Sequence, residues 1–289
     1  MHGCRMVLPA DSHVHSEWSW DTGGPTSPTA VGTMERTCAR AVRIGLPVVI
    51  FTEHLDMTGW TIDAVDVEEH QIPLISPDGV LEPPPLDVDG YLNCIERCRH
   101  RFPDLRILTG VEFGQPHRDG KTAAKLLDVS ELDRVNGSLH TLHADGKFFE
   151  PPTLYRMWPP DKVIWEYLAE VPRMMEGSEA YSVFTHIDYA VRYWPTDEAG
   201  PFDPRRFEDG FRQAMRAVAT SGRALEMNVR GWLRPWIPQW WSEEGGRAVT
   251  FGSDAHTEDR LANNFPEVMA MAEYHGFRPG RHPEDFWVR

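Results

Sequence analysis

The chain alternates short β-rich runs with longer runs of helical periodicity, and this alternation restricts its fold more than any other feature. Strands are predicted over residues 6–9, 47–52, 106–112, 134–138, 182–185, 224–228 and 248–252. Helices are predicted over residues 33–44, 89–101, 121–127, 161–175, 204–220 and 258–274. Because parallel strands need crossover connections, usually helices, the pattern predicts a barrel-like α/β fold with parallel strands.

A single domain, residues 1–289, is expected because no internal repeat or change of composition marks a boundary. One segment, residues 58–88, interrupts the alternation. It is rich in acidic residues and proline, including the run Pro83-Pro84-Pro85, and it shows little periodicity. A connection of this length is usually a lid or a binding loop. A solvated insertion with no part in the site is the alternative.

Charge and hydropathy exclude several classes of protein. Lys and Arg total 29 and Asp and Glu total 44, so the formal net charge is −15 at pH 7, whereas a nucleic-acid-binding surface is expected to be basic. No stretch approaches the roughly 20 apolar residues that cross a bilayer, and the N-terminus has no long apolar segment of the kind found in signal peptides. We therefore expect a cytoplasmic protein that binds neither nucleic acid nor a membrane. The oligomeric state is left open.

Histidines and carboxylates gather at the ends of the predicted strands. Six of the seven strands end on such residues or run into them: His13, His15, His54, Glu112, His140, His186, Asp254 and His256. In α/β barrels the carboxyl ends of the strands meet at one mouth, where active sites are built. Buried imidazoles and carboxylates are costly unless they are paired or bind metal. The set therefore predicts a site for several metal ions, and imidazole with carboxylate suits zinc, manganese or iron(II).

These motifs together resemble the polymerase and histidinol phosphatase (PHP) family of metal-dependent phosphoesterases. The resemblance rests on Asp11-x-His13-x-His15-x-x-x-Ser19-x-Asp21, the Thr52-Glu53-His54 turn, the isolated Glu112, Ser138-x-His140, Thr185-His186 and Gly252-Ser-Asp-Ala-His256. The matching segments extend over nearly the whole chain. The resemblance implies a distorted (β/α)7 barrel, which agrees with the seven predicted strands.

Within this family the chain is most similar to the histidinol-phosphate phosphatases. The similarity rests on Asp21 in the opening motif, on Tyr91-x-x-x-Ile95 before Gly110-x-Glu112, and on Asp133-x-x-x-Gly137-Ser-x-His140. It implies a phosphoric monoester hydrolase of histidine biosynthesis whose partner is a small phosphate ester, L-histidinol phosphate. Residues 58–88 and the tryptophan-rich stretch 232–241 depart from the compact members, and both lie where substrate specificity would be set.

The resemblance also implies a centre of three divalent metal ions with Glu112 as a bridge. The three implied ligand groups are His13, His15, Glu112 and Asp254; Glu112, His140 and His186; and Asp21, His54 and His256. Asp11 and Glu53 are expected to orient the neighbouring histidines. Asp188 and Asn228 are expected either to do the same or to cap the turns in which they lie.

An arginine is the expected further ligand of the phosphate, because its planar guanidinium presents a fork of donors. Arg230 is favoured, since it follows the one strand with no predicted ligand, and Arg192 is the competing candidate. His117 and His143 are expected to be ordinary loop residues. Most of the tryptophans after strands are expected to pack loops and a few to line a substrate pocket: Trp18, Trp20, Trp60, Trp194, Trp232, Trp236, Trp240 and Trp241.

Other functions fit parts of the pattern. A PHP phosphoesterase acting on nucleotides or on another small phosphate ester is the nearest alternative, although the acidic charge disfavours DNA. Amidohydrolase-like enzymes that cleave C–N bonds also open with His-x-His, but they usually bridge their metals with a carboxylated lysine, where this chain has Glu112. A binding protein built on an inactive barrel is expected to lack a metal ligand, and every expected position is filled.

Overall fold

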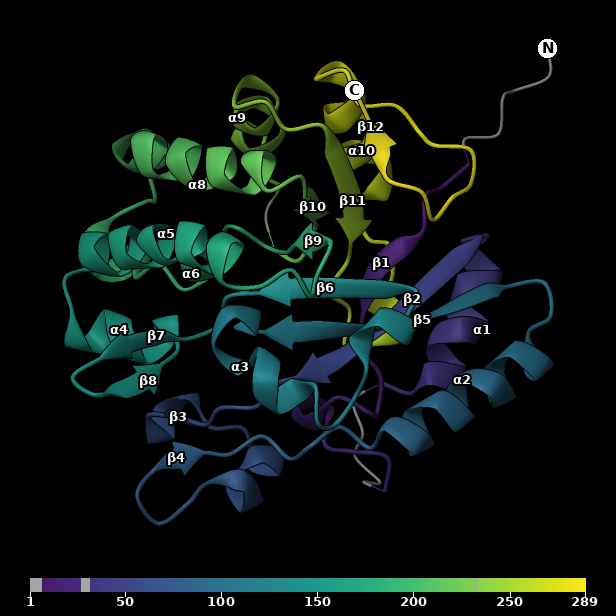
Figure 1. The fold of residues 1–289 in the computed structure, drawn as a ribbon, viewed down its shortest axis with the longest axis horizontal. Helices are drawn as coiled ribbons and strands as arrows, with labels where there is room; N and C mark the ends of the chain where they lie inside the picture. Colours follow the sequence, from purple (N-terminus) through teal and green to yellow (C-terminus); the bar gives the residue numbers. More distant parts are fainter. Residues whose placement is uncertain (1–6, 27–31, 232) are drawn as a thin grey trace.

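The computed structural model describes residues 7–26, 32–231 and 233–289. Its main sheet is curved (Figure 1). From one edge to the other, the strands of this sheet are β1 (Asp11–Val14), β2 (Val48–Leu55), β5 (Arg106–Gly114), β6 (Arg134–Ser138), β9 (Val183–Phe184), β10 (Ala224–Asn228), β11 (Ala248–Gly252) and β12 (Trp287–Val288). The first seven strands pair in parallel, and β12 joins β11 in antiparallel orientation.

The sheet closes between its first strand and the segment that follows β11. Val14 forms a parallel bridge with Ala255, whose carbonyl accepts a hydrogen bond from the backbone N–H of His15 at 2.9 Å. The backbone N–H of Asp254 donates to the carbonyl of His13 at 2.8 Å. These contacts confirm the expected seven-stranded barrel. The barrel is distorted, since the pairing of β1 with β2 is irregular between residues 11 and 14.

Helices pack around the outside of the barrel (Figure 1). They are α1 (Met34–Ile44), α2 (Val88–Arg101), α3 (Pro116–Ala123), α4 (Pro151–Met157), α5 (Pro160–Gly177), α6 (Tyr189–Arg192), α7 (Thr196–Ala199), α8 (Glu208–Thr220), α9 (Trp236–Glu243) and α10 (Phe265–Tyr274). Short 3-10 turns add η1 (Trp20–Thr22), η2 (Ala64–Asp66), η3 (Glu69–Leu74), η4 (Val129–Glu131), η5 (Pro204–Phe207) and η6 (Glu258–Arg260). α1 packs on α2, α5 on α8, and α8 on α9. No helix in the described ranges is both long and apolar enough to cross a bilayer.

Three of the predicted elements are misplaced. The strand predicted at residues 6–9 is wrong: residue 6 lies outside the described residues, residues 7–9 form no strand, and β1 begins at Asp11. All four residues of β1 are buried although three of them are polar, so the apolar signal precedes the strand. The helix predicted at residues 121–127 is α3, which starts at Pro116, since proline is favoured in the first helical turn. The helix predicted over residues 258–274 is divided into η6 and α10, which starts only at Phe265.

The segment 58–88 has secondary structure of its own and packs against the rest of the molecule. It contains the antiparallel strands β3 (Trp60–Thr61) and β4 (Val80–Leu81) together with η2 and η3. Arg156 of α4 forms ion pairs with Asp66 and with Asp63, the latter at 3.0 Å. Nε2 of His70 lies 2.7 Å from the carbonyl oxygen of Asp21. The segment therefore packs against α4 and against η1, which carries the predicted ligand Asp21. A second small hairpin, β7 (Leu142–Ala144) and β8 (Lys147–Phe149), contacts β3.

Candidate metal centre

The structure brings the nine predicted metal ligands together at the carboxyl end of the barrel. His54 and Glu112 lie near the ends of β2 and β5 themselves, Asp21 lies in η1, and the other ligands lie on or just after β1, β6, β9 and β11. Six of the nine residues are buried: His13, His15, Glu112, His140, His186 and Asp254. Strand alternation explains the first pair, since His13 and His15 are two residues apart and face the same side.

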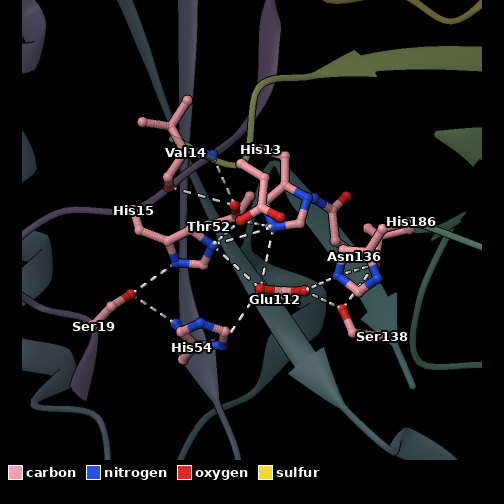
Figure 2. Close-up of polar contacts among 12 residues, drawn as sticks. His13, Val14, His15, Ser19, Thr52, His54, Glu112, Asn136, Ser138 and His186 are labelled. Carbon is pink, nitrogen blue, oxygen red and sulfur yellow. Dashed lines mark hydrogen bonds and ion pairs between the residues drawn. The ribbon is translucent and has the colours of Figure 1, made fainter. Parts of the chain in front are cut away.

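Glu112 occupies the middle of this cluster (Figure 2). Its Oε2 lies 3.1 Å from Nε2 of His13 and 3.2 Å from Nε2 of His15. Its Oε1 lies 3.1 Å from Nε2 of His140 and 2.7 Å from Nε2 of His186. Oε2 also lies 3.4 Å from Nδ1 of His54. The two oxygens of one carboxylate thus face separate sets of imidazoles, which is the geometry that a bridging ligand requires.

Asp254 lies beside the first pair of imidazoles. Its Oδ1 is 3.9 Å from Nε2 of His13 and 3.7 Å from Nε2 of His15, and the two Nε2 atoms are 3.1 Å apart. Ligand atoms of these three residues all lie within 4.8 Å of one another, close enough for one ion to contact them all. A similar group combines His13, Glu112 and His186.

Asp21 contacts the two remaining ligands, His54 and His256, at the outer side of the site. Its Oδ2 lies 2.7 Å from Nε2 of His256 and 3.4 Å from Nε2 of His54. The ring of His15 stacks on both of these rings, with centroid distances of 4.3 Å to His256 and 4.4 Å to His54. His15, His54 and His256 also form a group with metal-binding spacing.

The protonation of these groups fits a metal centre. Burial, together with the charges of His256 and His54, lowers the pKa of His15 to about 3, so this ring keeps a free lone pair for a metal. Burial alone would raise the pKa of Glu112, but the charges of His13, His140 and His54 outweigh it and hold the pKa well below its ordinary value. An ionised carboxylate beside an imidazole with a free lone pair is part of a donor set for a divalent cation.

Glu226 supports two of these histidines from β10, the strand with no predicted ligand. Its Oε1 accepts a hydrogen bond from Nδ1 of His13 at 2.7 Å, and its Oε2 accepts one from the backbone N–H of His186 at 2.9 Å. Asn228 donates to Oε2 of Glu226 at 3.0 Å, and its Oδ1 accepts a hydrogen bond from the backbone N–H of Arg230 at 2.8 Å, so of its two expected roles it has that of capping the turn. No role is predicted for Glu226 from the sequence, although an acidic residue inside a buried parallel strand is itself a signal of function.

The carboxylates of Glu53 and Asp11 do not contact the imidazole rings of the histidines next to them in the sequence. They hydrogen-bond to Ser19 and to backbone N–H groups instead. Glu53 accepts a hydrogen bond from Oγ of Ser19 at 2.6 Å, and this Oγ lies 2.9 Å from Nδ1 of His15. Asp11 accepts hydrogen bonds at 2.9 Å from the backbone N–H groups of Ser253 and Ala262, which hold the turn that carries Asp254. Both carboxylates therefore position ligands of the first group.

Asp188 has a different partner from the one expected. Its Oδ2 accepts a hydrogen bond from Nε of Arg234 at 2.6 Å, and its side chain does not cap α6. It belongs to an ion pair beside the site.

Asp56 is a further residue that the sequence did not reveal. Its carboxylate lies 3.3 Å from Nδ1 of His54 and 3.5 Å from Nδ1 of His140, and it accepts a hydrogen bond from Nε1 of Trp20 at 3.0 Å. Gly114 leaves the space for it, because a Cβ there would lie 1.9 Å from Oδ1 of Asp56. Asp56 thus positions two ligands that belong to different predicted metal groups.

Both candidate arginines reach the mouth of the site. Nη1 of Arg192 lies 2.8 Å from Oδ2 of Asp254, and Nη1 of Arg230 lies 2.9 Å from Oδ1 of the same residue. The Arg192 side chain is 12% exposed, whereas that of Arg230 is 50% exposed. Nε and Nη2 of Arg192 are buried and have no hydrogen-bond partner among the residues that the structure describes. The guanidinium of Arg192 therefore keeps donors for a ligand.

A pocket with a volume of about 280 Å³ opens over this cluster. Its lining combines predicted ligands and both arginines with Trp20, Trp60, Tyr189, Tyr193 and Glu150. The segment 58–88 contributes part of the wall through Trp60, Ile62, Asp66, Glu68, Gln71 and Leu81.

The other tryptophans and histidines considered from sequence have structural surroundings. Trp194, Trp240 and Trp241 are buried in the core, Trp18 and Trp236 pack against it, and Trp232 lies outside the described residues. Nε2 of His117 pairs with Glu170 at 2.9 Å, and the ring of His143 packs on Phe148. None of these described residues lines the pocket.

An α/β barrel with imidazoles and carboxylates gathered at the carboxyl ends of its strands defines a metal-binding barrel protein. The sequence matches the family described as PHP domain over residues 11–230. The chain therefore belongs to the PHP family, as its motifs predict.

Several relatives match most of the chain. A histidinol-phosphatase of Lactococcus lactis is 26% identical over 276 residues, 92% of this chain and 91% of the relative. A probable histidinol-phosphatase of Deinococcus radiodurans is 24% identical over 91% of this chain and 92% of the relative. The crystal structure of the histidinol phosphate phosphatase of Lactococcus lactis, complexed with zinc, L-histidinol and phosphate, has a TM-score of 0.74 at 22% identity and covers 94% of this chain and 95% of its own. This likeness shows that the two chains share a fold.

Proposed function

We propose that this protein is a metal-dependent phosphoric monoester hydrolase that acts on L-histidinol phosphate. The observation that carries the proposal is the position of Glu112, whose two carboxylate oxygens face separate sets of imidazoles beneath a pocket with two arginines. Relatives named as histidinol-phosphatases support it, since they match more than nine-tenths of the chain. The zinc, L-histidinol and phosphate of the Lactococcus lactis structure support both the metal and the substrate.

Three groups of residues are proposed to hold three divalent ions, which are zinc, manganese or iron. The groups are His13, His15, Glu112 and Asp254; Glu112, His140 and His186; and Asp21, His54 and His256. When bound, such ions supply Lewis acidity that activates water and neutralises phosphoryl oxygens. Glu226, Asp56 and Glu53 hold the imidazoles in the orientation that the ions need.

Arg192 and Arg230 are proposed to bind the phosphate group. Both guanidinium groups are held at the mouth by Asp254, and a planar fork of donors matches the non-bridging oxygens of a phosphate. Their pairing with Asp254 fixes them before the substrate arrives. Donors that are already in place stabilise the charge that develops on the phosphoryl oxygens during hydrolysis.

The remaining parts of the proposal concern the whole molecule. We propose that the chain is a single domain, which the match to relatives over most of their length supports. A biosynthetic phosphatase of this type is expected to work in the cytoplasm on a small-molecule substrate. Nucleic acid is disfavoured as a partner by the net charge of −15.

The experiment that tests the proposal is an assay of purified protein with manganese, zinc and iron(II) in turn. The substrates are L-histidinol phosphate and a panel of nucleoside monophosphates. We expect metal-dependent release of phosphate with a marked preference for L-histidinol phosphate. A preference for the nucleotides would favour the alternative phosphoesterase function, and release of no phosphate from any ester would contradict the proposal.

A further inference from the structure

A half-buried carboxylate, that of Glu150, lies on the wall of the pocket outside the metal ligands. Glu150 directly precedes α4, and its side chain does not cap that helix. Its Oε1 accepts a hydrogen bond from the hydroxyl of Tyr189 at 3.0 Å. The ring of Tyr189 packs against His140 and His186, with both centroid distances at 5.1 Å. One tyrosine thus separates this carboxylate from two predicted metal ligands.

The arginines of the pocket and of α4 are paired with other carboxylates. Arg156 of α4 pairs with Asp63 and Asp66 of the segment 58–88. Arg192 and Arg230 both pair with Asp254. No ion pair to Glu150 is present within the ranges that the structure describes. The charge of Glu150 is therefore left without a salt-bridge partner.

The electrostatics of Glu150 agree with this geometry. Burial raises the pKa of its carboxyl group, and the charge of His140 and the hydroxyl of Tyr189 only partly oppose the rise. A half-buried carboxylate without a counter-ion is less well solvated than an exposed one, and pairing with a cation would offset that loss. Trp20, Trp60 and Tyr193 line the same cavity, and aromatic faces of this kind also attract cations.

We propose that Glu150 binds the cationic amino group of the substrate and so selects small phosphate monoesters that carry an amine. This inference rests on the phosphatase function proposed above and assigns a specificity residue within that site. The phosphate would lie with the arginines and metal ligands, and the amine with Glu150, inside one cavity of about 280 Å³. A bound ester without the amine would cover the carboxylate of Glu150 without pairing it, and this penalty discriminates against that ester.

The test compares Glu150→Gln with the wild-type protein on two esters. One is L-histidinol phosphate and the other is its analogue without the amino group, both assayed at about pH 8, where an imidazole with an ordinary pKa is neutral. We expect the variant to lose about 30-fold or more in kcat/KM for the amine ester and less than about 3-fold for the analogue. Glu267→Gln, an exposed change on α10, serves as the control and is expected to alter neither value.

A second measurement does not depend on turnover. Calorimetric titration with L-histidinol alone is expected to show binding to the wild-type protein and binding at least about 10-fold weaker to Glu150→Gln, with metal content unchanged. Equal losses of activity on both esters, or unaltered binding of L-histidinol, would overturn the inference. If the wild-type protein hydrolyses neither ester, the phosphatase proposal fails, whereas the titration still decides whether Glu150 recognises an amine.

Discussion

The carboxylate of Glu226 lies 2.7 Å from Nδ1 of His13, and this contact directs the opposite nitrogen of the ring, Nε2, to Glu112 at 3.1 Å. A carboxylate on the far nitrogen fixes the tautomer of a metal-binding imidazole and makes it a better donor. The strand without a predicted ligand therefore contributes a residue that positions one.

Replacement of Glu226 should weaken metal binding without removing a ligand. We expect Glu226→Gln to lower the affinity for one metal ion by about 10- to 100-fold, because the amide orients the ring of His13 less well than the carboxylate does. Metal titration followed by calorimetry measures this change. The exposed Glu267→Gln is the matched control, and identical titrations of the two variants would contradict the positioning role.

Removal of either arginine should lower activity with the metals retained. Arg192 is more buried than Arg230 and has two nitrogens without partners among the described residues, so we expect Arg192→Ala to be the more damaging change. Losses in kcat/KM of roughly 100-fold, about 2.7 kcal/mol, are expected for a donor that contacts the phosphate in the transition state. Wild-type rates in both variants would mean that the arginines do not bind the phosphate.

Metal binding should release protons. Burial alone would lower the pKa of His140, but Glu112 and Asp56 raise it to about 9 in the metal-free protein, so the ring is protonated at neutral pH. Because a metal ion binds only the neutral ring, the metal affinity is expected to increase as the pH rises towards about 9. Calorimetry in two buffers that differ in ionisation enthalpy measures the protons released. An affinity that falls over this range would contradict the assignment of His140 as a ligand.

The raised pKa of His140 makes the metal-free protein less stable as the pH rises, although it makes metal binding stronger. A raised folded-state pKa contributes stability that is fully present below the ordinary pKa of His140, near 6.5, and is lost as the pH rises through about 9. Chelator-treated protein is therefore expected to melt at a lower temperature at high pH than at neutral pH.

Chelation at neutral pH should remove activity and leave the fold in place. The barrel has its own apolar core, in which Phe51, Phe113 and Phe251 are fully buried on the strands, so folding does not depend on metal as it does in a zinc finger. Circular dichroism before and after chelation measures this. Global unfolding in the chelator would show that the metals hold the barrel together.

Much of the fold could be predicted from the sequence because its strands alternate with helices. The bounds of β6, β10 and β11 agree with prediction. Apolar residues mark β10 and β11, whereas β6 has Val135 as its one large apolar residue. The prediction misplaces β1 because its sequence, Asp11-Ser-His-Val14, is mostly polar. Its polar side chains are buried because they form part of the site, not because they are hydrophobic. β12 and α9 were missed, because a two-residue strand and a helix containing Pro238 carry weak local signals.

Most of the predicted ligands can be found from the sequence because they end or follow a strand, whereas their supporting residues are harder to find. Asp56 contacts two imidazoles only because Gly114 on the next strand leaves space for it. Glu150 is held at the pocket by a hydrogen bond from Tyr189, whose ring packs against the ligand His140. Contacts of this kind depend on how elements pack in three dimensions, and local sequence does not encode them.

The most direct test of the three-metal centre is elemental analysis of the wild-type protein beside Glu112→Gln. We expect about three ions per wild-type chain and about one in the variant, because a neutral amide bridges two cations poorly and both groups that share Glu112 are weakened. Turnover is expected to fall with the metal content, while Glu267→Gln retains both. One ion or fewer in active wild-type protein, or a Glu112→Gln variant with full metal content and near-normal turnover, would contradict the bridging role of Glu112.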